Sequence, residues 1–315
     1  MTYTPPNKTT LDWLLDADPA IRWQVLQDIA DAPAEIVAAE RARVAHEGWG
    51  AHLLSLQQPN GDWGGGAWVY QSWASTFETL MLLREMGLDP RSEPTRKAIE
   101  LVREHSNWGQ YHNHAPFFEG ESEPCINGRV LAIGAYFGAA SPALAERLLS
   151  EQLPDGGWNC DAPESKHSSF NTTICVLEGL FAYERATGDS RIAAARQRGE
   201  EFLLQRQLYK SLQSGQPIQQ DRKSGKDWRI ITFPTRWHYD ILWALDYLHS
   251  TGAAPDPRAA EAVALVASKQ TAEGVWLLES YHDGAEHFRM ETLGQPSRWL
   301  TLRALRVLRW HSLAS

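Results

Sequence analysis

Carboxylate and histidine side chains stand where a purely structural core would avoid them. Glu78 lies inside an apolar helical run, His238 and Asp240 stand at the start of another, and Asp161 lies in the polar loop before a third. A charge costs several kcal/mol to bury without a partner, so such groups either form ion pairs or face a polar cavity. In a cavity, Asp240, Asp161 or Glu78 would act as acid or base. His238 would take part in acid–base catalysis or orient the substrate.

Ion pairing between neighbouring helices is the structural alternative to catalysis for two of these carboxylates. Arg129 and Arg298 both occur near the start of apolar runs. Either guanidinium could neutralise Glu78 or Asp240. Such a pair would stabilise helix contacts and would carry no chemistry.

A second set of polar and aromatic residues occupies the loops and first helical turns that would line a pocket. Tryptophan rings can stabilise a carbocation through their π faces or stack on a sugar ring. Histidine, asparagine and arginine side chains can orient a substrate through hydrogen bonds. The predicted substrate-binding residues are Trp68, Trp73, His112, His114, Asn127, Arg129, Trp237, Tyr239, His282, Arg298 and Trp299.

Some residues in these loops could also ligate a metal ion, because their side chains offer nitrogen, sulfur or carboxylate donors. Their spacing matches no standard zinc motif, so surface or capping histidines are the simpler interpretation. These donors are His112, His114, Cys125, Cys160, Asp161 and His282.

The composition describes a packed globular protein without a nucleic-acid surface. Hydrophobic residues make up 43% and charged residues 22% of the 315 residues, and a net charge of −9 leaves no basic footprint. No GxGxxG, P-loop, HExxH or GxSxG motif occurs, so no nucleotide is expected and the cofactor stays unassigned. No apolar run reaches the ~18 residues that a membrane-spanning helix needs, which leaves peripheral membrane contact open. A polar N-terminus and three cysteines without a CxxC pair predict a cytoplasmic protein of unspecified oligomeric state.

One short pattern occurs three times and organises the elements that carry these residues. A glutamine is followed by a glycine four residues later and a tryptophan two beyond, over 57–63, 152–158 and 270–276. Glycine permits a tight reversal after a helix, the tryptophan folds back over that helix, and the glutamine amide bonds free backbone groups. Trp108 and Trp228 mark two decayed copies, so joints recur every 45–50 residues or so, with one insertion of about twenty.

Joints at this period predict an array of helix pairs. Six apolar inner helices are expected from about 20, 72, 124, 167, 235 and 297, alternating with six amphipathic outer helices. The first long outer helix is expected to run unbroken over 34–57, and 229–233 is the one stretch where a strand competes. Six pairs close into a ring more readily than they form an open array, which would need polar caps at both ends. We therefore predict one all-α (α/α)6 toroid over 1–315, with a polar insertion or flap at approximately 208–232.

The Gln-xxx-Gly-x-Trp joints resemble the QW repeats of the squalene-hopene and oxidosqualene cyclases. More broadly, they are similar to the toroid shared by class II diterpene cyclases and protein prenyltransferase β subunits. The resemblance covers nearly the whole chain and implies a central aromatic-lined cavity for a small hydrophobic or prenyl substrate. The Asp-x-Asp-Asp acid motif of the cyclases has no counterpart here, so protonation would need a rearranged acid site.

The same resemblance implies a candidate zinc site. Prenyltransferase β subunits hold zinc through Asp-x-Cys at the start of one inner helix and a histidine at the start of the next. Here Glu123 and Cys125 stand at the start of the helix expected from 124, and His167 stands near the start of the next. The implied ligands are Cys125, Glu123 and His167.

Three functions remain open on these residues. The leading one is a terpene cyclase- or prenyltransferase-like enzyme that performs acid–base catalysed cyclisation or prenyl transfer on an isoprenoid. The alternatives are a carbohydrate-active (α/α)6 hydrolase, lyase or epimerase, which would use carboxylates and stacking tryptophans, and a non-catalytic lipid-binding or scaffold toroid. A deep apolar cavity favours the first, an open polar groove the second, and a filled centre the third.

Overall fold

The computed structural model describes residues 3–218, 225 and 227–313 as two compact units. The terminal unit, which carries both chain ends, comprises 1–41, 203–282 and 288–315. The central unit comprises 42–202 and 283–287. The chain is all-α, as predicted, and the described residues contain one two-stranded sheet in addition to helices.

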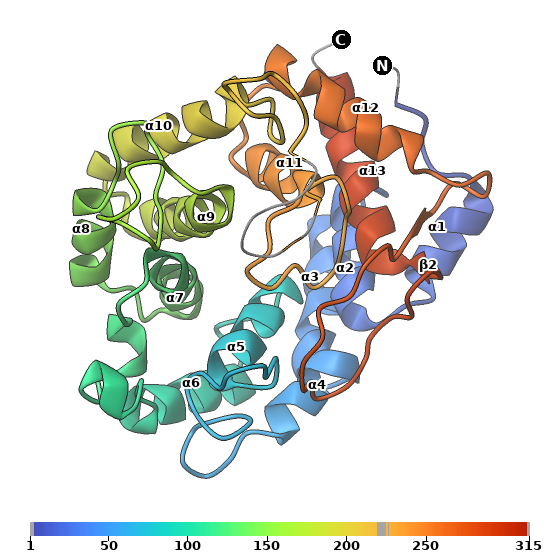
Figure 1. The fold of residues 1–315 in the computed structure, drawn as a ribbon. Coiled ribbons are helices and arrows are strands. Elements are labelled where there is room, and N and C mark those ends of the chain that lie inside the picture. Colours follow the sequence, from blue (N-terminus) through green and yellow to red (C-terminus); the bar gives the residue numbers. More distant parts are fainter. Residues whose placement is uncertain (1–2, 219–224, 226, 314–315) are drawn as a thin grey trace. The chain divides into compact units, whose positions relative to one another are not determined.

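The terminal unit contains helices from both ends of the chain (Figure 1). Helix α13 packs against α11 and α2, and the short strands β1 and β2 pair antiparallel with Trp276 opposite Ser297. The elements of this unit are α1 (Lys8–Leu15), α2 (Pro19–Asp28), α3 (Ala34–Ala42, which ends at the boundary), α11 (Ile241–Ser250), η4 (Pro257–Ala259), α12 (Ala260–Ser268), β1 (Trp276–Leu277), β2 (Pro296–Ser297) and α13 (Arg298–Ser312).

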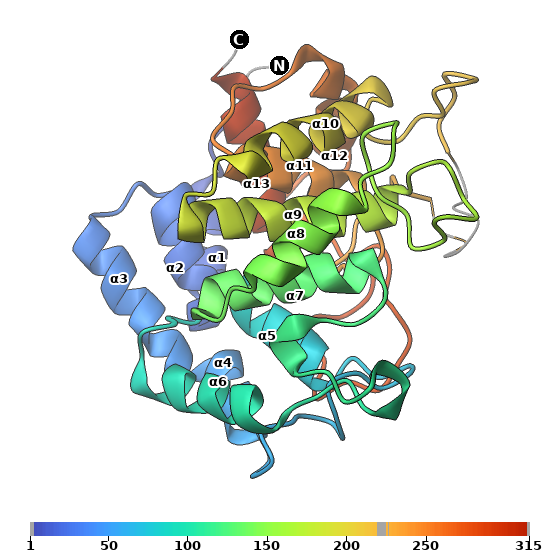
Figure 2. The same cartoon turned by 90° about the vertical axis from the view of Figure 1, so that its left-hand side faces the viewer.

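The central unit alternates mostly buried helices with amphipathic ones. Helix α9 packs closely along α7, and the two lie side by side in both views of the molecule (Figures 1 and 2). Its elements are η1 (Arg43–Ala45), α4 (Gly48–Ser55), α5 (Thr76–Glu85), α6 (Glu93–His105), η2 (Gln110–His112), η3 (Phe117–Glu119), α7 (Pro124–Phe137), α8 (Pro142–Ser150), α9 (Phe170–Thr187) and α10 (Arg191–Gln205, which crosses the boundary).

The three intact joints share one geometry. Each tryptophan is buried, and its indole Nε1 donates to the carbonyl oxygen ten residues earlier at 2.7 Å; these pairs are Trp63–Leu53, Trp158–Leu148 and Trp276–Val266. Each glutamine amide also donates to the carbonyl of the glycine four residues on, at 3.0, 2.6 and 3.2 Å. The predicted staple is confirmed at these joints.

A threonine in the following buried helix completes each joint. The tryptophan backbone N–H donates at 3.0 Å to a threonine hydroxyl; the acceptors are Thr76, Thr173 and Thr301. Trp108 departs from the pattern, because its Nε1 donates forward to the Phe117 carbonyl at 2.9 Å. Its joint has kept a buried tryptophan and lost the backward bond.

Several expected boundaries are corrected by the structure. The outer helix expected over 34–57 is broken between α3 and α4, where Gly48 adopts a φ of 65° that continues no right-handed helix. Residues 229–233 form no strand. Within the expected insertion 208–232, positions 219–224 and 226 lie outside the described residues. Leu208 and Ile231, at its two ends, are fully buried, so those ends belong to the core of the terminal unit.

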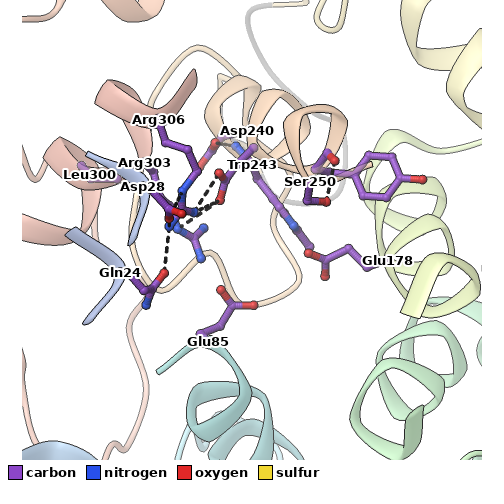
Figure 3. A network of polar contacts seen from close by, with 12 residues as sticks. Gln24, Asp28, Glu85, Glu178, Asp240, Trp243, Ser250, Leu300, Arg303 and Arg306 are labelled. Carbon is purple, nitrogen blue, oxygen red and sulfur yellow. Dashed lines mark hydrogen bonds and ion pairs between the residues drawn. The ribbon is translucent and has the colours of Figure 1, made fainter. Parts of the chain in front are cut away.

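Arg306 on α13 ties the terminal unit together through charge. Its guanidinium contacts the Asp28 carboxylate at 2.7 Å, the Asp246 carboxylate at 3.0 Å and the Gln24 amide oxygen at 2.9 Å. Figure 3 shows Arg306 with Gln24 and Asp28. Burial would raise the pKa of Asp246, but Arg306 and Arg303 outweigh it and hold that pKa below its usual range. The network joins α2, α11 and α13.

Candidate active site

Asp240 is the N-cap of α11, which begins at Ile241 and not at about 235 as expected. Its carboxylate accepts hydrogen bonds from the Trp243 N–H at 2.8 Å and the Thr232 N–H at 3.2 Å. Aspartate is favoured here because its oxygen satisfies a backbone donor that the helix leaves free. The side chain is 2% exposed, and Figure 3 shows it beside Trp243 and Arg303.

Burial dominates the electrostatics of this carboxyl. It raises the pKa of Asp240 from 3.8 to about 7, although the two backbone donors and the Arg303 guanidinium favour the charged form. The carboxyl therefore gains and loses its proton in the neutral pH range. A carboxyl that both holds and releases a proton near pH 7 is suited to general acid catalysis.

Aromatic rings lie on the segment next to Asp240 and on the first turn of α13. Phe233 follows Thr232, and its ring stacks on Trp299 with centroids 4.2 Å apart. The Arg303 guanidinium lies 4.8 Å from the Phe233 centroid on the same side of α13 as Trp299. The π faces of such rings attract cationic groups.

Two histidines extend this aromatic group. His238 stacks on the buried His282 with centroids 4.1 Å apart, and Trp237 lies against His238 at 3.7 Å. The structure therefore places the rings of Trp237, His238 and His282 in contact.

Hydrogen bonds between two loops hold these residues in register. The Thr232 hydroxyl donates to the Ser280 carbonyl at 2.7 Å, and the Ile231 N–H donates to the Glu279 carboxylate at 2.9 Å. The loop before α11 is thereby fixed along the loop that carries His282. The hydroxyl of Tyr239, a predicted substrate-binding residue, donates to the Leu208 carbonyl at 2.6 Å, and burial raises its pKa well above 10.

Glu78 takes the ion-pair alternative in the central unit. Arg129 donates to both of its carboxylate oxygens, at 3.1 and 3.3 Å, and both side chains are buried. The guanidinium also lies 4.6 Å from the centroid of the Phe77 ring. Glu78 is therefore engaged in a buried ion pair, which is the structural alternative to a catalytic role.

Several predicted substrate-binding residues of the central unit bond to the loop before α7. The Asn127 amide accepts from the Glu121 N–H at 2.8 Å and donates to the Glu121 carbonyl at 3.0 Å. His112 Nδ1 lies 3.6 Å from the Glu121 carboxylate, and the exposed His114 lies 3.2 Å from the Asn107 amide oxygen. The contacts of Asn127 and His112 with Glu121 thus hold the loop before α7 in place.

Two tryptophans and a loop carboxylate from the predicted site belong to the central unit, whereas Asp240 belongs to the terminal unit. Trp68 is 48% exposed, and the Trp73 indole donates to the Asp283 carbonyl at 3.0 Å. Asp161 is exposed in the loop before α9. In the terminal unit, Arg298 donates to the Trp13 carbonyl at 3.1 Å.

The candidate metal ligands are brought together only in part. Among the described residues, Glu123, Cys125 and Cys160 form a group whose donor atoms all lie within 4.8 Å of one another. Cys160 thus stands beside Glu123 and Cys125, and the exposed His167 is outside this group.

Sequence reasoning missed Phe233 and Arg303 as neighbours of the acid. A signal for Arg303 was present, because it follows Trp299 by four residues and so shares its helix face. Phe233 carried no such signal, since only the fold of the loop before α11 places it there.

None of the described helices is both long and apolar enough to cross a membrane. No protein-family model and no curated protein matches the chain.

Solved structures give distant likenesses over most of the chain. The apo type II terpene cyclase MstE from Scytonema is 15% identical, with 95% of this chain and 89% of that chain covered and a TM-score of 0.47. A variant of MstE in complex with the product merosterolic acid A is 15% identical. The match covers 95% of this chain and 88% of that chain, with a TM-score of 0.48. A protein from Actinoplanes is 17% identical. The match covers 94% of this chain and 90% of that chain, with a TM-score of 0.43. At these values the likeness assigns no residue a role.

Proposed function

We propose that the protein is a terpene cyclase-like enzyme that binds an isoprenoid chain and starts its cyclisation by protonation from Asp240. The observation that carries the proposal is the buried Asp240 carboxyl, whose pKa burial raises to about 7. It accepts the Thr232 N–H, and the next residue along the chain, Phe233, stacks on Trp299. The QW-type joints support it, because they resemble those of proteins that process isoprenoids.

The proposed chemistry needs no cofactor. The Asp240 carboxyl gives its proton to a terminal alkene of the substrate, whose π electrons form the new C–H bond and leave a tertiary carbocation. Ring closure moves the cation along the chain, where aromatic faces such as those of Phe233 and Trp299 stabilise it. Loss of a proton from carbon restores an alkene, so the overall reaction is an isomerisation.

The carbohydrate-active alternative receives less support from the residues around Asp240. A glycosidase needs two carboxyl groups that share the scissile bond. Glu279, on the loop bonded to the Asp240 segment, is committed to the Lys269 ammonium at 2.7 and 2.9 Å and accepts the Ile231 N–H. Its role is accordingly structural.

A product screen tests the proposal. The protein is incubated with farnesyl, geranylgeranyl and uncharged polyprenyl substrates, and the extracts are analysed by gas chromatography–mass spectrometry. We expect a cyclic isomer from at least one substrate, and at least a ~100-fold loss of its formation in Asp240→Asn. Asparagine keeps an oxygen for the Trp243 N–H, so the α11 cap survives while the acid is removed. Asp12→Asn, on the exposed face of α1, is the matched control.

The proposal fails if no cyclic product forms with any of these substrates. It also fails if Asp240→Asn retains the turnover of the Asp12→Asn control.

A further inference from the structure

We infer that Glu123, Cys125 and Cys160 form a binding site for a divalent cation that prefers sulfur ligands. Zinc is the ion we expect there. The site lies in the central unit and is independent of the function proposed for Asp240. The third ligand is Cys160 from the loop before α9, and not His167.

The three donors come from two elements, the start of α7 and the loop before α9. The Cys125 thiol lies 3.5 Å from the Glu123 carboxylate, and both lie within 4.8 Å of the Cys160 sulfur. Tetrahedral ligands on bonds of about 2.0–2.3 Å stand ~3.5–3.8 Å apart, so small side-chain rotations complete the geometry. Two sulfurs and one carboxylate favour zinc over magnesium or calcium, which prefer oxygen ligands.

The close packing of α7 on α9 brings these elements together. A Cβ on Gly179 would lie 2.1 Å from the Gly128 carbonyl oxygen, and a Cβ on Gly128 would lie 2.5 Å from the Cys175 carbonyl oxygen. The two glycines therefore let the helices approach at backbone distance. Cys125, in the first turn of α7, is thus held near the chain that enters α9.

The loop before α9 is ordered around Cys160. The Thr172 hydroxyl lies 3.4 Å from both the backbone nitrogen and the sulfur of Cys160. The neighbouring Asn159 amide donates to the His167 carbonyl at 2.7 Å and to the Ser165 hydroxyl at 3.0 Å. These bonds present the Cys160 sulfur to Cys125.

Charge and access also suit a metal ion. Two thiolates and a carboxylate around a divalent cation carry a net charge of −1, which the positive N-terminal end of α7 stabilises. Glu123 is exposed and both cysteines are half-buried, so an ion can enter from solvent. Three protein ligands leave a fourth position for water or a ligand atom.

Cobalt titration tests the site. The full-length protein is reduced, freed of metal by a chelator and titrated with Co²⁺ while its absorption is recorded. We expect one equivalent to produce thiolate-to-cobalt charge-transfer absorption that Zn²⁺ abolishes. Cys125→Ser and Cys160→Ser should each lose most of this absorption and bind Zn²⁺ at least ~10-fold more weakly. Zinc should also protect both thiols from alkylation.

His167→Ala and Cys175→Ser are the matched controls, and both should bind Co²⁺ as the unmodified protein does. Circular dichroism confirms that each variant is folded before titration. The inference is overturned if Cys160→Ser binds Co²⁺ normally, if His167→Ala abolishes binding, or if the reduced, folded protein binds no Co²⁺. Oxidation to a Cys125–Cys160 disulfide in the presence of excess Zn²⁺ would likewise overturn it.

Discussion

Asp240 meets two opposing demands, because a helix cap favours a charged carboxylate and a buried position favours a neutral one. Burial prevails and raises its pKa from 3.8 to about 7. Between about pH 4 and pH 7, Asp240 therefore keeps its proton in the folded protein and has lost it in the unfolded chain. This group stabilises the fold at low pH, and that contribution is lost as pH rises through 7.

The Asp240→Asn variant should lack this contribution to the pH dependence of the free energy of unfolding. Urea unfolding at pH 5 and pH 8 should show a larger loss of stability in the unmodified protein, by on the order of 2 kcal/mol. Equal losses in the two proteins would mean that Asp240 titrates near its ordinary pKa.

The joint tryptophans are predicted to act through their indole N–H as well as through packing. Trp158→Phe removes the 2.7 Å bond to Leu148 and leaves that carbonyl without its indole donor. We expect a loss of ~1–3 kcal/mol in the free energy of unfolding, measured by denaturant titration. Trp68→Phe, at a half-exposed ring, should change it by less than ~0.5 kcal/mol. Similar small effects at both positions would contradict the staple.

Helices α7 and α9 are held at backbone distance by Gly128 and Gly179. Alanine normally stabilises a helix interior over glycine by ~0.5–1 kcal/mol. Gly179→Ala should instead destabilise the protein by ~1–3 kcal/mol, because the new methyl would lie 2.1 Å from the Gly128 oxygen and force the helices apart. Thermal unfolding gives the sign directly, and a raised melting temperature would refute this packing.

Helix starts and joints were predictable because their signals are local. The Asp18–Pro19 pair begins α2 as a capping aspartate and a first-turn proline should, and α7 begins at Pro124. The break at Gly48 was missed, since an apolar helical pattern continues across it on both sides.

The candidate sites were predictable only as residue types. Asp240 stood out as a carboxylate beside apolar residues, yet it is bonded to Thr232, next to Phe233, on a loop that no periodicity encodes. Cys160 stands beside Cys125 because of the α7–α9 packing and the Thr172 contacts, which join residues 12 to 35 positions apart. Partners distant in sequence cannot be inferred from local pattern.

The two ends of the chain belong to one unit, which Arg306 braces between α2 and α11. Arg306→Ala would leave the largely but not fully buried carboxylates of Asp28 and Asp246 without their common partner. We expect a loss of ~3–5 kcal/mol in unfolding free energy. Arg309→Ala, which loses a contact to the exposed Asp31, should cost no more than ~1 kcal/mol. Equal costs in denaturant titrations would argue against a buried brace.

The proposed function depends on a proton at Asp240, and nuclear magnetic resonance can observe that proton without knowledge of the substrate. The protein is labelled with ¹³C at aspartate carboxyls and titrated, and the Asp240 signal is assigned by its absence in Asp240→Asn. We expect a transition near pH 7. A transition at or below about pH 4, the ordinary range of aspartate, would contradict the acid assigned here.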